Sequence, residues 1–537
     1  MDGSGSGKSA SYSIPNAYQM LGSYVFTDPK GELYDRTAGY LKENGYEIKV
    51  LNLVRPQYSD GYNPLMHISS ELDVDVIANT IVKGQQSESG KADPYWDDMA
   101  EMLLKALIYY LIATRPEEEQ NLASCAELVR AANNNGGSNL LTELISQLPY
   151  DHPARMYYKS IEIAPEKTYG SILSSLQSKL GKFDSKEIAE LTSTDTIDFE
   201  AIGEKKTAVY VISSDTHTAY DFLLTIFFSQ MIQQLYDHAD QNGGALKEQT
   251  FFILDEFANI GKIPDFDKKI STSRSRKISF SVILQNVDQL EAVYEKSYET
   301  IMGNCDTHVF LGSNSYKTVE YFSKALGEKT IAKQSLSVNR DKHMWRQGYS
   351  DSEQIMARAL MTPDELRRLD NDICIIYEKG IKPVKAQKFY YFKHPMARKL
   401  AECEISHNDI GEIERGTWRK YNPYNPYVEE KENEKKVENL KVESLDDLFD
   451  DEPMEEKANK KVLVKEQKGL DLNNKTEPKM TEQLDLEAFD LEDLSLDNNN
   501  DDMPPILPQY NDGEDEYDLQ KELEAKFDEL FGPLDED

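Results

Sequence analysis

Short apolar runs separated by polar turns recur along the first 420 residues of the chain. Each run is rich in β-branched or aromatic residues and contains few polar positions. Near-continuous apolarity is typical of strands that are covered on both faces, as in a parallel α/β sheet. The runs predict buried strands at Ser23–Thr27, Glu47–Leu53, Thr207–Ile212, Thr250–Leu254, Ser279–Leu284, His308–Leu311 and Ile373–Tyr377.

Amphipathic patterns of helical period lie between these strands, for example at Phe222–His238 and Asp267–Arg276. Residues 97–203 differ from the rest, because they hold long amphipathic stretches and little strand signal. We therefore expect an all-α insertion domain at 97–203, set into an α/β nucleotide-binding domain that is formed by residues 1–96 and 204–420.

Residues 421–537 have a composition of their own. They contain 37 acidic and 13 basic residues, which accounts for two thirds of the net charge of −36. Such a segment buries too little apolar surface to offset its ordering entropy, so we expect a disordered acidic tail. Its short apolar islands favour folding on a partner, and an inert solubilising tail is the alternative. Because most of the charge lies in the tail, overall acidity does not exclude a nucleic-acid partner for the body.

No CxxC pair occurs among the cysteines, which stand far apart at Cys125, Cys305, Cys374 and Cys403. This spacing excludes a zinc ribbon and fits a reducing, cytoplasmic setting. No apolar run reaches the roughly 18–20 residues that a membrane span needs, and the first residues do not resemble a signal peptide. From the sequence we expect this chain to be soluble.

The chain opens with a glycine-rich segment that ends in Gly7-Lys8-Ser9. With Gly3 and Gly5 before it, the segment matches the phosphate-binding loop GxxxxGK[ST], in which backbone amides and the lysine bind phosphates and the serine hydroxyl binds Mg²⁺. Two features depart from the motif: Asp2 stands at its first glycine, and no strand precedes the loop in this sequence. A flexible Gly/Ser leader is the alternative interpretation.

A second motif follows the apolar run Phe251–Leu254, which ends in the adjacent carboxylates Asp255 and Glu256. This is the Walker B pattern, in which the first carboxylate binds Mg²⁺ and the second orients or deprotonates the attacking water. A strand that ends in a solvated acidic turn is the alternative. Gln285 follows the next predicted strand, where it is either a γ-phosphate sensor or a simple strand cap. Together the two motifs indicate a RecA-like nucleotide-binding core.

Longer motifs surround these two. The Walker B residues continue as DEFANIGKIPDF over Asp255–Phe266, and TDPKGEL occupies Thr27–Leu33. Shorter segments that belong to the same pattern occur at Asn63–Leu65, Asp93–Trp96, Ser171–Leu176, Gly303–Asp306 and Leu360–Leu366. In this order they resemble the TraG/VirD-type coupling proteins of conjugative type IV secretion systems. The resemblance covers residues 3 to about 395, and the two long motifs are more specific than either Walker box.

The resemblance implies a RecA-like P-loop ATPase that binds ATP and Mg²⁺ and assembles as a homo-hexamer. It implies that this ATPase recruits single-stranded DNA with an attached relaxase and accessory proteins, and drives conjugative transfer into the secretion channel. It also implies an N-terminal membrane anchor and a location on the cytoplasmic side of the cell membrane. This sequence contains no anchor, so we interpret it as a shortened form, a mispredicted start, or a fragment whose other part is encoded separately.

The resemblance also implies roles for single residues. Phosphates are bound by the glycine-rich loop, at Gly3, Gly5, Gly7, Lys8 and Ser9. The metal is bound by Ser9 and Asp255, the attacking water by Glu256, and Gln285 takes the sensor position.

Arg274 and Arg276 follow the Walker B strand in a basic segment. In a ring ATPase such arginines can act as fingers that stabilise phosphoryl charge across a subunit boundary. The same residues could instead bind DNA phosphates, or they could lie on a solvated helix face. The sequence leaves these three interpretations open.

Two other functions compete with the coupling ATPase. An FtsK/HerA-like DNA translocase is expected to carry a DNA-reading C-terminal domain, which is the opposite of this acidic tail. A non-catalytic docking adaptor with a degenerate P-loop is favoured by Asp2 and opposed by the Asp255–Glu256 pair. On the leading hypothesis the tail either docks basic relaxases or occupies the pore of the idle ring.

Overall fold

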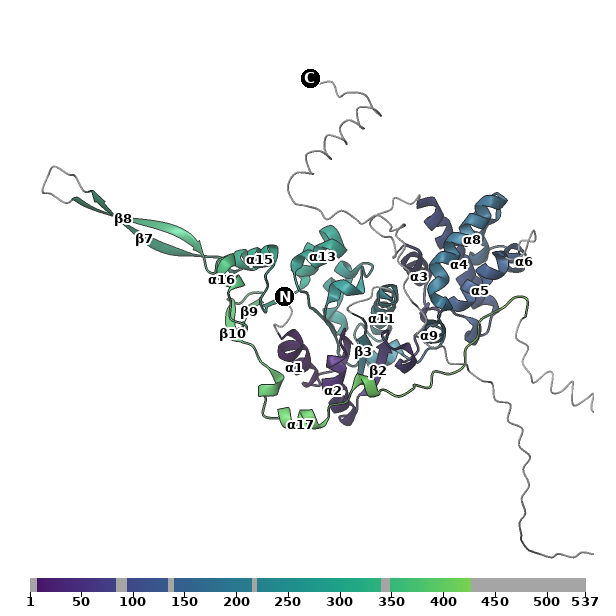
Figure 1. Cartoon of the computed structure of the whole chain (residues 1–537), viewed down its shortest axis with the longest axis horizontal. Helices are drawn as coiled ribbons and strands as arrows, with labels where there is room; N and C mark the ends of the chain where they lie inside the picture. Colours follow the sequence, from purple (N-terminus) through teal and green to yellow (C-terminus); the bar gives the residue numbers. More distant parts are fainter. Residues whose placement is uncertain (1–6, 84–93, 134–139, 215–219, 340–347, 426–537) are drawn as a thin grey trace, which may run out of the picture. The chain divides into compact units, whose positions relative to one another are not determined.

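The computed structural model describes residues 7–83, 94–133, 140–214, 220–339 and 348–425 (Figure 1). Within these ranges a five-stranded sheet forms the centre of the body. Its strands are parallel and lie in the order β2 (Glu47–Asn52), β3 (Thr207–Ile212), β1 (Ser23–Thr27), β4 (Thr250–Leu254) and β5 (Ile278–Val282). The apolar runs predicted all of these strands, and each boundary lies within two residues of its expected place.

Side chains of the sheet enter two hydrophobic clusters, one on each face. Val25 belongs to the cluster that contains α11 (Asp221–Gln241). Tyr24 and Phe26 belong to the cluster that contains α2 (Glu32–Glu43). Every residue of β1 and β3 is buried. These strands therefore read as continuous apolar runs because none of their positions faces water.

Between β2 and β3 the described residues form only helices and turns. Helix α4 (Pro94–Thr114) packs against α3, α5, α7 and α8. Figure 1 shows α3, α5 and α8 beside it. Its Leu103 and Leu107 belong to the same continuous cluster as Val25 of β1, so this helical segment shares its core with the sheet. The domain boundaries at 97 and 203 stay a prediction. The other helices here are α3 (Glu71–Lys83), α5 (Leu122–Asn133), α6 (Leu140–Ser146), α7 (Pro153–Glu162), α8 (Glu166–Leu180), α9 (Lys186–Leu191) and α10 (Phe199–Glu204).

Short helices flank the sheet after each of its later strands. The predicted helix 267–276 is split into α12 (Phe266–Thr272) and a single 3-10 turn at Arg274–Arg276. After β5 the chain forms α13 (Val287–Tyr294) and α14 (Tyr298–Asn304). The short helix α1 (Ile14–Ala17) leads into β1.

The structure differs from the expectation of one covered parallel sheet at two strands. β6 (Thr307–Phe310) and β9 (Ile373–Glu378) pair antiparallel and form a separate three-stranded sheet with β10 (Val384–Gln387). A small cluster that includes Phe322 of α15 (Tyr316–Leu326) packs against Phe310 of β6 and Ile375 of β9, while several other residues of the three strands are exposed. Antiparallel sheets tolerate an exposed face, so apolarity alone does not distinguish them from buried parallel strands. Helix α16 (Pro363–Arg367) completes this region.

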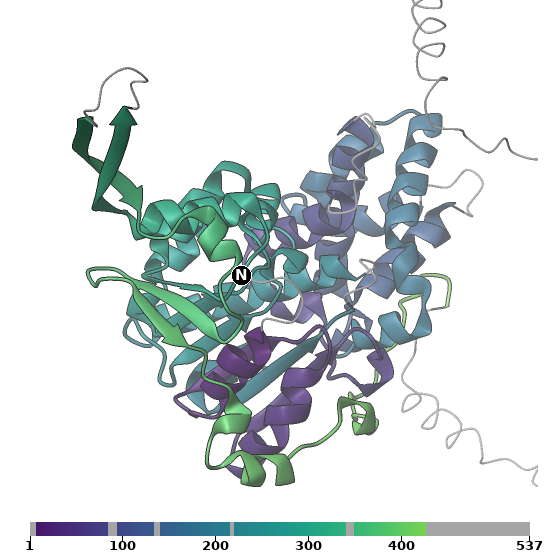
Figure 2. The same ribbon diagram turned by 60° about the vertical axis from the view of Figure 1, so that its left-hand side comes forward.

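A long antiparallel hairpin was not predicted from the sequence. It consists of β7 (Glu328–Asn339) and β8 (Gly348–Ala359), paired from Glu328↔Ala359 to Asn339↔Gly348. Figure 2 shows it as dark green arrows, distinct from the light green β9 and β10. Polar residues dominate both strands, and a sequence search that looks for buried apolar runs therefore does not detect them.

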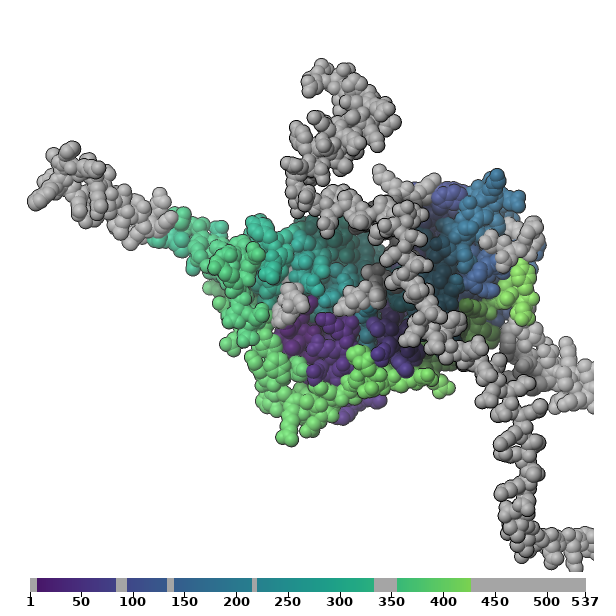
Figure 3. Space-filling model, viewed as in Figure 1, coloured from purple at the N-terminus to yellow at the C-terminus, as the bar shows by residue number. Residues whose placement is uncertain are grey.

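Residues 388–425, which we call the C-terminal strap, connect the small antiparallel sheet to the helical segment. The strap contains α17 (Ala397–Glu402). Ile405 donates its N–H to Asp35 O of α2 at 3.1 Å, and Arg419 donates its N–H to Glu118 O at 3.0 Å. Figure 3 shows the green strap running below the purple N-terminal residues. The strap therefore joins parts of the body that are distant in sequence.

The sequence predicts a disordered acidic tail at residues 421–537. From residue 426 onward this tail lies outside the described part of the chain. Among the described helices, none combines the length and the apolar character that crossing a membrane would need.

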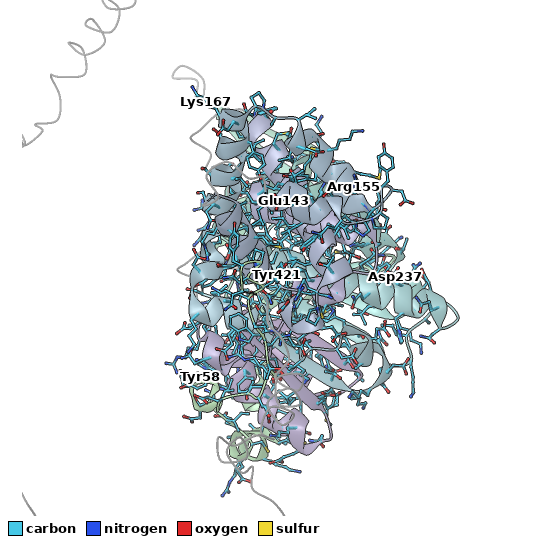
Figure 4. The ribbon with its side chains drawn as sticks, turned by 90° about the vertical axis from the view of Figure 1, so that its right-hand side faces the viewer. Tyr58, Glu143, Arg155, Lys167, Asp237 and Tyr421 are labelled. Carbon is cyan, nitrogen blue, oxygen red and sulfur yellow. The ribbon has the colours of Figure 1, made fainter. Side chains whose placement is uncertain are left out.

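The end of the strap generates a test of stability. Tyr421 is buried in the helical segment (Figure 4), where its N–H is donated to Ser124 Oγ at 2.9 Å and the Arg115 guanidinium lies 4.3 Å from its ring centre. Tyr421→Ala should lower the free energy of unfolding by about 3 kcal/mol, because it leaves a cavity in a packed core. Urea unfolding measures this change. The matched control Tyr424→Ala, whose ring is largely exposed, should change it by about 0.5 kcal/mol or less. Equal effects would contradict anchoring by Tyr421.

Candidate nucleotide-binding site

The first described residues form the start of a helix that follows a glycine turn. Gly7 has a φ of 75°, a left-handed conformation that glycine adopts without strain. A π-helical segment over Ser9–Ser13 follows and continues into α1. Ser11 donates both its N–H and its hydroxyl to Gly7 O at 2.8 Å. A glycine turn that leads into a helix start is an arrangement that binds phosphate. Gly3 and Gly5 lie outside the described residues.

The structure brings Lys8 to the Walker B carboxylate. Lys8 Nζ lies 3.4 Å from Asp255 Oδ1, directly beyond the end of β4. Asp255 is 9% exposed, and this burial raises the pKa of its carboxyl, while the Lys8 ammonium opposes the rise. Ser9, the other predicted metal ligand, begins the helix beside Lys8. Its role as a ligand stays a prediction.

Two amides hold the second carboxylate. Gln285 Nε2 donates to Glu256 Oε1 at 3.3 Å, and Asn259 Nδ2 donates to Glu256 Oε2 at 3.1 Å. Glu256 itself has a φ of 52°, which turns the chain sharply after Asp255. The predicted sensor and the predicted water-binding residue therefore lie together, at the carboxyl ends of the neighbouring strands β4 and β5.

Strand β1 supports the same edge of the sheet. The Thr27 hydroxyl donates to Asp255 O at 2.7 Å. The next residue, Asp28, is turned toward α2, where Oδ2 accepts the N–H of Tyr34 at 2.8 Å. Burial raises the pKa of the Asp28 carboxyl to about 6, and this hydrogen bond opposes the rise. Asp28 therefore anchors the start of α2.

Arg274 and Arg276, which the sequence could not distinguish, have different surroundings. Arg276 donates from Nε and Nη2 to the two carboxylate oxygens of Asp240, at 2.9 and 2.8 Å, and lies over the Tyr236 ring. The Arg274 side chain is 95% exposed, and its nearest ion-pair contact is Asp306 at 4.0 Å. Arg276 therefore fixes its turn to α11, whereas Arg274 extends into solvent.

Sequence reasoning missed several residues beside the site. Asn259 lies inside the long motif, and only its short spacing from Glu256 could have drawn attention to it. The Tyr12 hydroxyl and Ser281 Oγ form a hydrogen bond of 2.8 Å between the helix start and β5. Tyr390 of the strap lies against Gly7, so that a Cβ at this glycine would meet its ring at 3.0 Å. Nothing in the sequence pattern indicates these two long-range contacts.

A parallel sheet, a helix start with Gly7-Lys8-Ser9 and an acidic pair at the adjoining strand end define a P-loop protein with a RecA-like core. A family model confirms this class and narrows it. The model described as "Type IV secretory system Conjugative DNA transfer" matches residues 1–445. The chain belongs to this family.

Curated relatives agree with the family. The chain is 25% identical over 418 residues to Protein VirD4 of Agrobacterium fabrum, covering 74% of this chain and 59% of that protein. It is 24% identical over 427 residues to the conjugal transfer protein TraG of Escherichia coli, covering 73% of this chain and 66% of that protein. The chain thus spans about three fifths of the VirD4 length.

Solved structures confirm the fold. The plasmid coupling protein TrwB in complex with the non-hydrolysable ATP analogue ADPNP superposes with a TM-score of 0.53 at 16% identity, covering 78% of this chain and 87% of that chain. A sulphate complex of the bacterial conjugative coupling protein TrwBdeltaN70 gives 0.52 at 17% identity, with 75% and 87% covered. These similarities establish the RecA-like architecture that the sequence predicted.

Asp28 predicts a pH dependence of stability. The ordinary pKa of the Asp28 carboxyl is 3.8, and burial raises it to about 6 in the folded protein. At a pH between these two values, Asp28 has lost its proton in the unfolded chain but keeps it in the folded protein. The folded state then binds more protons, so the free energy of unfolding falls as the pH rises through this window. Asp28→Asn removes this loss. The free energy of unfolding of Asp28→Asn, minus that of the unchanged protein, should rise by about 2–3 kcal/mol from pH 4 to pH 7. Urea unfolding at the two pH values measures this difference. A difference that does not vary with pH would contradict it.

The two arginines predict unequal effects on stability. Arg276→Ala removes a paired contact with Asp240 and should lower the free energy of unfolding by about 1 kcal/mol, whereas Arg274→Ala should change it by about 0.5 kcal/mol or less. Arg276→Lys should restore little, because lysine cannot reproduce the two parallel hydrogen bonds. Thermal or urea unfolding of the three variants measures these changes in the free energy of unfolding. Equal losses for Arg274→Ala and Arg276→Ala would contradict a structural role that is specific to Arg276.

Proposed function

We propose that this chain is the motor part of a type IV secretion coupling protein, an ATPase that drives DNA with its attached relaxase into the secretion channel. The observation that carries the proposal is the cluster of Lys8, Asp255, Glu256 and Gln285 at one edge of the sheet, in a chain of the conjugative DNA transfer family. The ADPNP complex of TrwB supports ATP as the nucleotide.

The donor groups at this edge fit a nucleotide and Mg²⁺. A buried carboxylate that faces a lysine ammonium and the start of a helix combines an oxygen ligand for the cation with donors for the phosphates. Asp255 and Ser9 would hold Mg²⁺, and the glycine-rich loop with Lys8 would hold the phosphates. Bound there, the cation neutralises charge that develops on the phosphoryl oxygens.

Glu256 supplies the base in this proposal. Its two carboxylate oxygens each accept an amide hydrogen bond, from Gln285 and from Asn259, so the group is oriented before a water molecule arrives. Preorganised acceptors of this kind contribute to catalysis because little reorientation is needed during the reaction. Gln285 then links the strand end of β5 to the state of the nucleotide.

Partners outside the chain complete the proposed machine. The Arg274 side chain extends into solvent, whereas Arg276 is engaged by Asp240. We propose that Arg274 meets either the nucleotide of a second copy or a DNA phosphate. We propose a homo-hexamer that is held by a membrane anchor on the cytoplasmic side of the cell membrane. Accessory proteins and the channel are the further partners that the family function requires.

The two alternative functions differ from the coupling ATPase in different ways, and the docking adaptor is the one that ATP turnover can distinguish. Family membership favours the coupling protein over an FtsK/HerA-like translocase. An adaptor with a degenerate P-loop, which Asp2 favours, would recruit the same substrates without hydrolysing ATP.

ATP turnover with and without single-stranded DNA tests the motor. We expect DNA-stimulated hydrolysis that Lys8→Ala abolishes together with nucleotide binding. Glu256→Gln should keep nucleotide binding and lower turnover by about 100-fold or more, because it removes only the base. The exposed carboxylate variant Glu117→Gln is the matched control and should leave both unchanged. Failure to bind nucleotide, combined with retained binding of a relaxase–DNA complex, would favour the adaptor.

A further inference from the structure

The C-terminal strap is attached to the body at its middle and at its far end, and the two attachments differ in kind. In the middle, Leu400 and Cys403 belong to the hydrophobic cluster that contains α2. There the main chain lies so close to α2 that a Cβ at Gly39 would overlap the carbonyl oxygen of Cys403. His407 donates its N–H to Asp35 Oδ1 at 2.5 Å, and its ring nitrogen Nδ1 lies 2.9 Å from the same oxygen. Apolar packing and hydrogen bonds therefore fix the middle of the strap.

An irregular stretch joins the two attachments. Residues 410–418 form neither helix nor strand, and none of their backbone N–H groups is hydrogen-bonded to another residue of the described ranges. The stretch contains Gly411 and Gly416, and Gly416 has a φ of 86°. Segments with few hydrogen bonds open locally at a lower free-energy cost than a packed core. The far end can therefore leave the body by rotation within this stretch while the middle stays in place.

Buried charge dominates the attachment at the far end. Arg419 donates from Nε to Glu119 Oε1 at 2.8 Å, and Arg115 donates from its own Nε to Glu119 Oε2 at 2.6 Å. The Glu119 side chain is 1% exposed, so one buried carboxylate is shared by two guanidiniums. A buried ion pair adds little net stability, because the cost of removing its charges from water offsets their attraction. The ring of Tyr421 supplies the apolar part of this attachment.

Arg415 makes the same attachment less favourable. Its side chain is 5% exposed, and its nearest ion-pair contact is Glu190, whose Oε1 lies 3.6 Å from Nη2. Nε and Nη1 of Arg415 are buried and have no hydrogen-bond partner within the part of the chain that the structure describes. Burial of a guanidinium with unpaired donors costs free energy, which is recovered when the group returns to water. The docked far end therefore contains an interaction that favours its release.

We propose that residues 411–421 form a latch, which detaches from the helical segment while the middle of the strap stays on α2. Arg415 favours the open state, and Glu119 holds the closed one. In the closed state the strap connects Tyr390, which lies against Gly7, to the helical segment. In the open state this connection is broken. The latch is a conformational device of the fold, and its existence does not depend on ATP hydrolysis.

Substitution of Arg415 tests the latch. Arg415→Met keeps an unbranched apolar side chain and removes the guanidinium, so the closed state should become more favourable. Hydrogen exchange at the Arg419 and Tyr421 amides, which we call the latch amides, should slow about tenfold or more, because both are hydrogen-bonded to the helical segment in the closed state. The Ile405 amide, which is bonded to α2, should not change. The matched control is Arg398→Met, at a 95% exposed arginine of α17, which should alter none of these rates.

Substitution of Glu119 shifts the same equilibrium in the opposite direction. Glu119→Gln removes the charge that the two guanidiniums share and should speed exchange of the latch amides about tenfold, again with no change at Ile405. Glu117→Gln, at an exposed neighbouring residue, is the control and should leave all three rates unchanged. Tryptic cleavage after Lys420, measured by peptide mapping, should be slowest in Arg415→Met and fastest in Glu119→Gln, because cleavage requires the open segment.

Faster or unchanged exchange of the latch amides in Arg415→Met would overturn the proposal, because Arg415 would then stabilise the docked end or have no part in its balance. Failure of this variant to fold would overturn it for the same reason. Equal acceleration at the latch amides and at Ile405 in Glu119→Gln would also overturn it, because the strap would then open as one unit. None of these readouts involves nucleotide, so they are independent of ATP turnover.

Discussion

The contact between the Lys8 ammonium and the buried Asp255 carboxylate is the constraint on which the site depends. A buried carboxylate without a cationic or hydrogen-bonding partner is strongly unfavourable, so the strand end and the loop stabilise each other. Strand β4 brings Asp255 to this position because it lies between β1 and β5, and the Thr27 hydroxyl fixes the Asp255 carbonyl. The order of the strands thereby fixes where the Asp255 carboxylate meets the Lys8 ammonium.

The sequence predicts those parts of the fold that follow from local chemistry. Continuous apolar runs identified the strands of the parallel sheet, because a strand that is buried on both faces needs apolar residues at successive positions of the sequence. The Walker B acids were predicted for the same reason, since they terminate such a run. The pairing of β6 with β9 and the polar hairpin β7–β8 were not predictable, because partner choice is decided by contacts between residues that are distant in sequence.

The same limit applies within the site. Arg274 and Arg276 are chemically identical and nearly adjacent, and only the position of Asp240 on α11 separates an engaged side chain from an exposed one. Tyr390 reaches Gly7 through the strap, and Tyr421 anchors the far end of that strap in the helical segment. Contacts of this kind depend on the completed tertiary structure, so no pattern of local spacing contains them.

Helix α11 connects the site to the helical segment. The turn that follows Glu256 is bonded to it, because the Thr225 hydroxyl donates to Ile260 O at 2.6 Å. Further along the same helix, Gln230 Nε2 donates to Pro64 O at 2.9 Å, in the segment that leads from β2 into α3. A displacement of the turn after Glu256 therefore acts on one packed helix, whose other contacts hold the entry to the helical segment. Close packing transmits such displacements because the interior has little free volume to absorb them. The hydrogen bonds of α11 thus give a direct physical connection between the turn after Glu256 and the helical segment between β2 and β3.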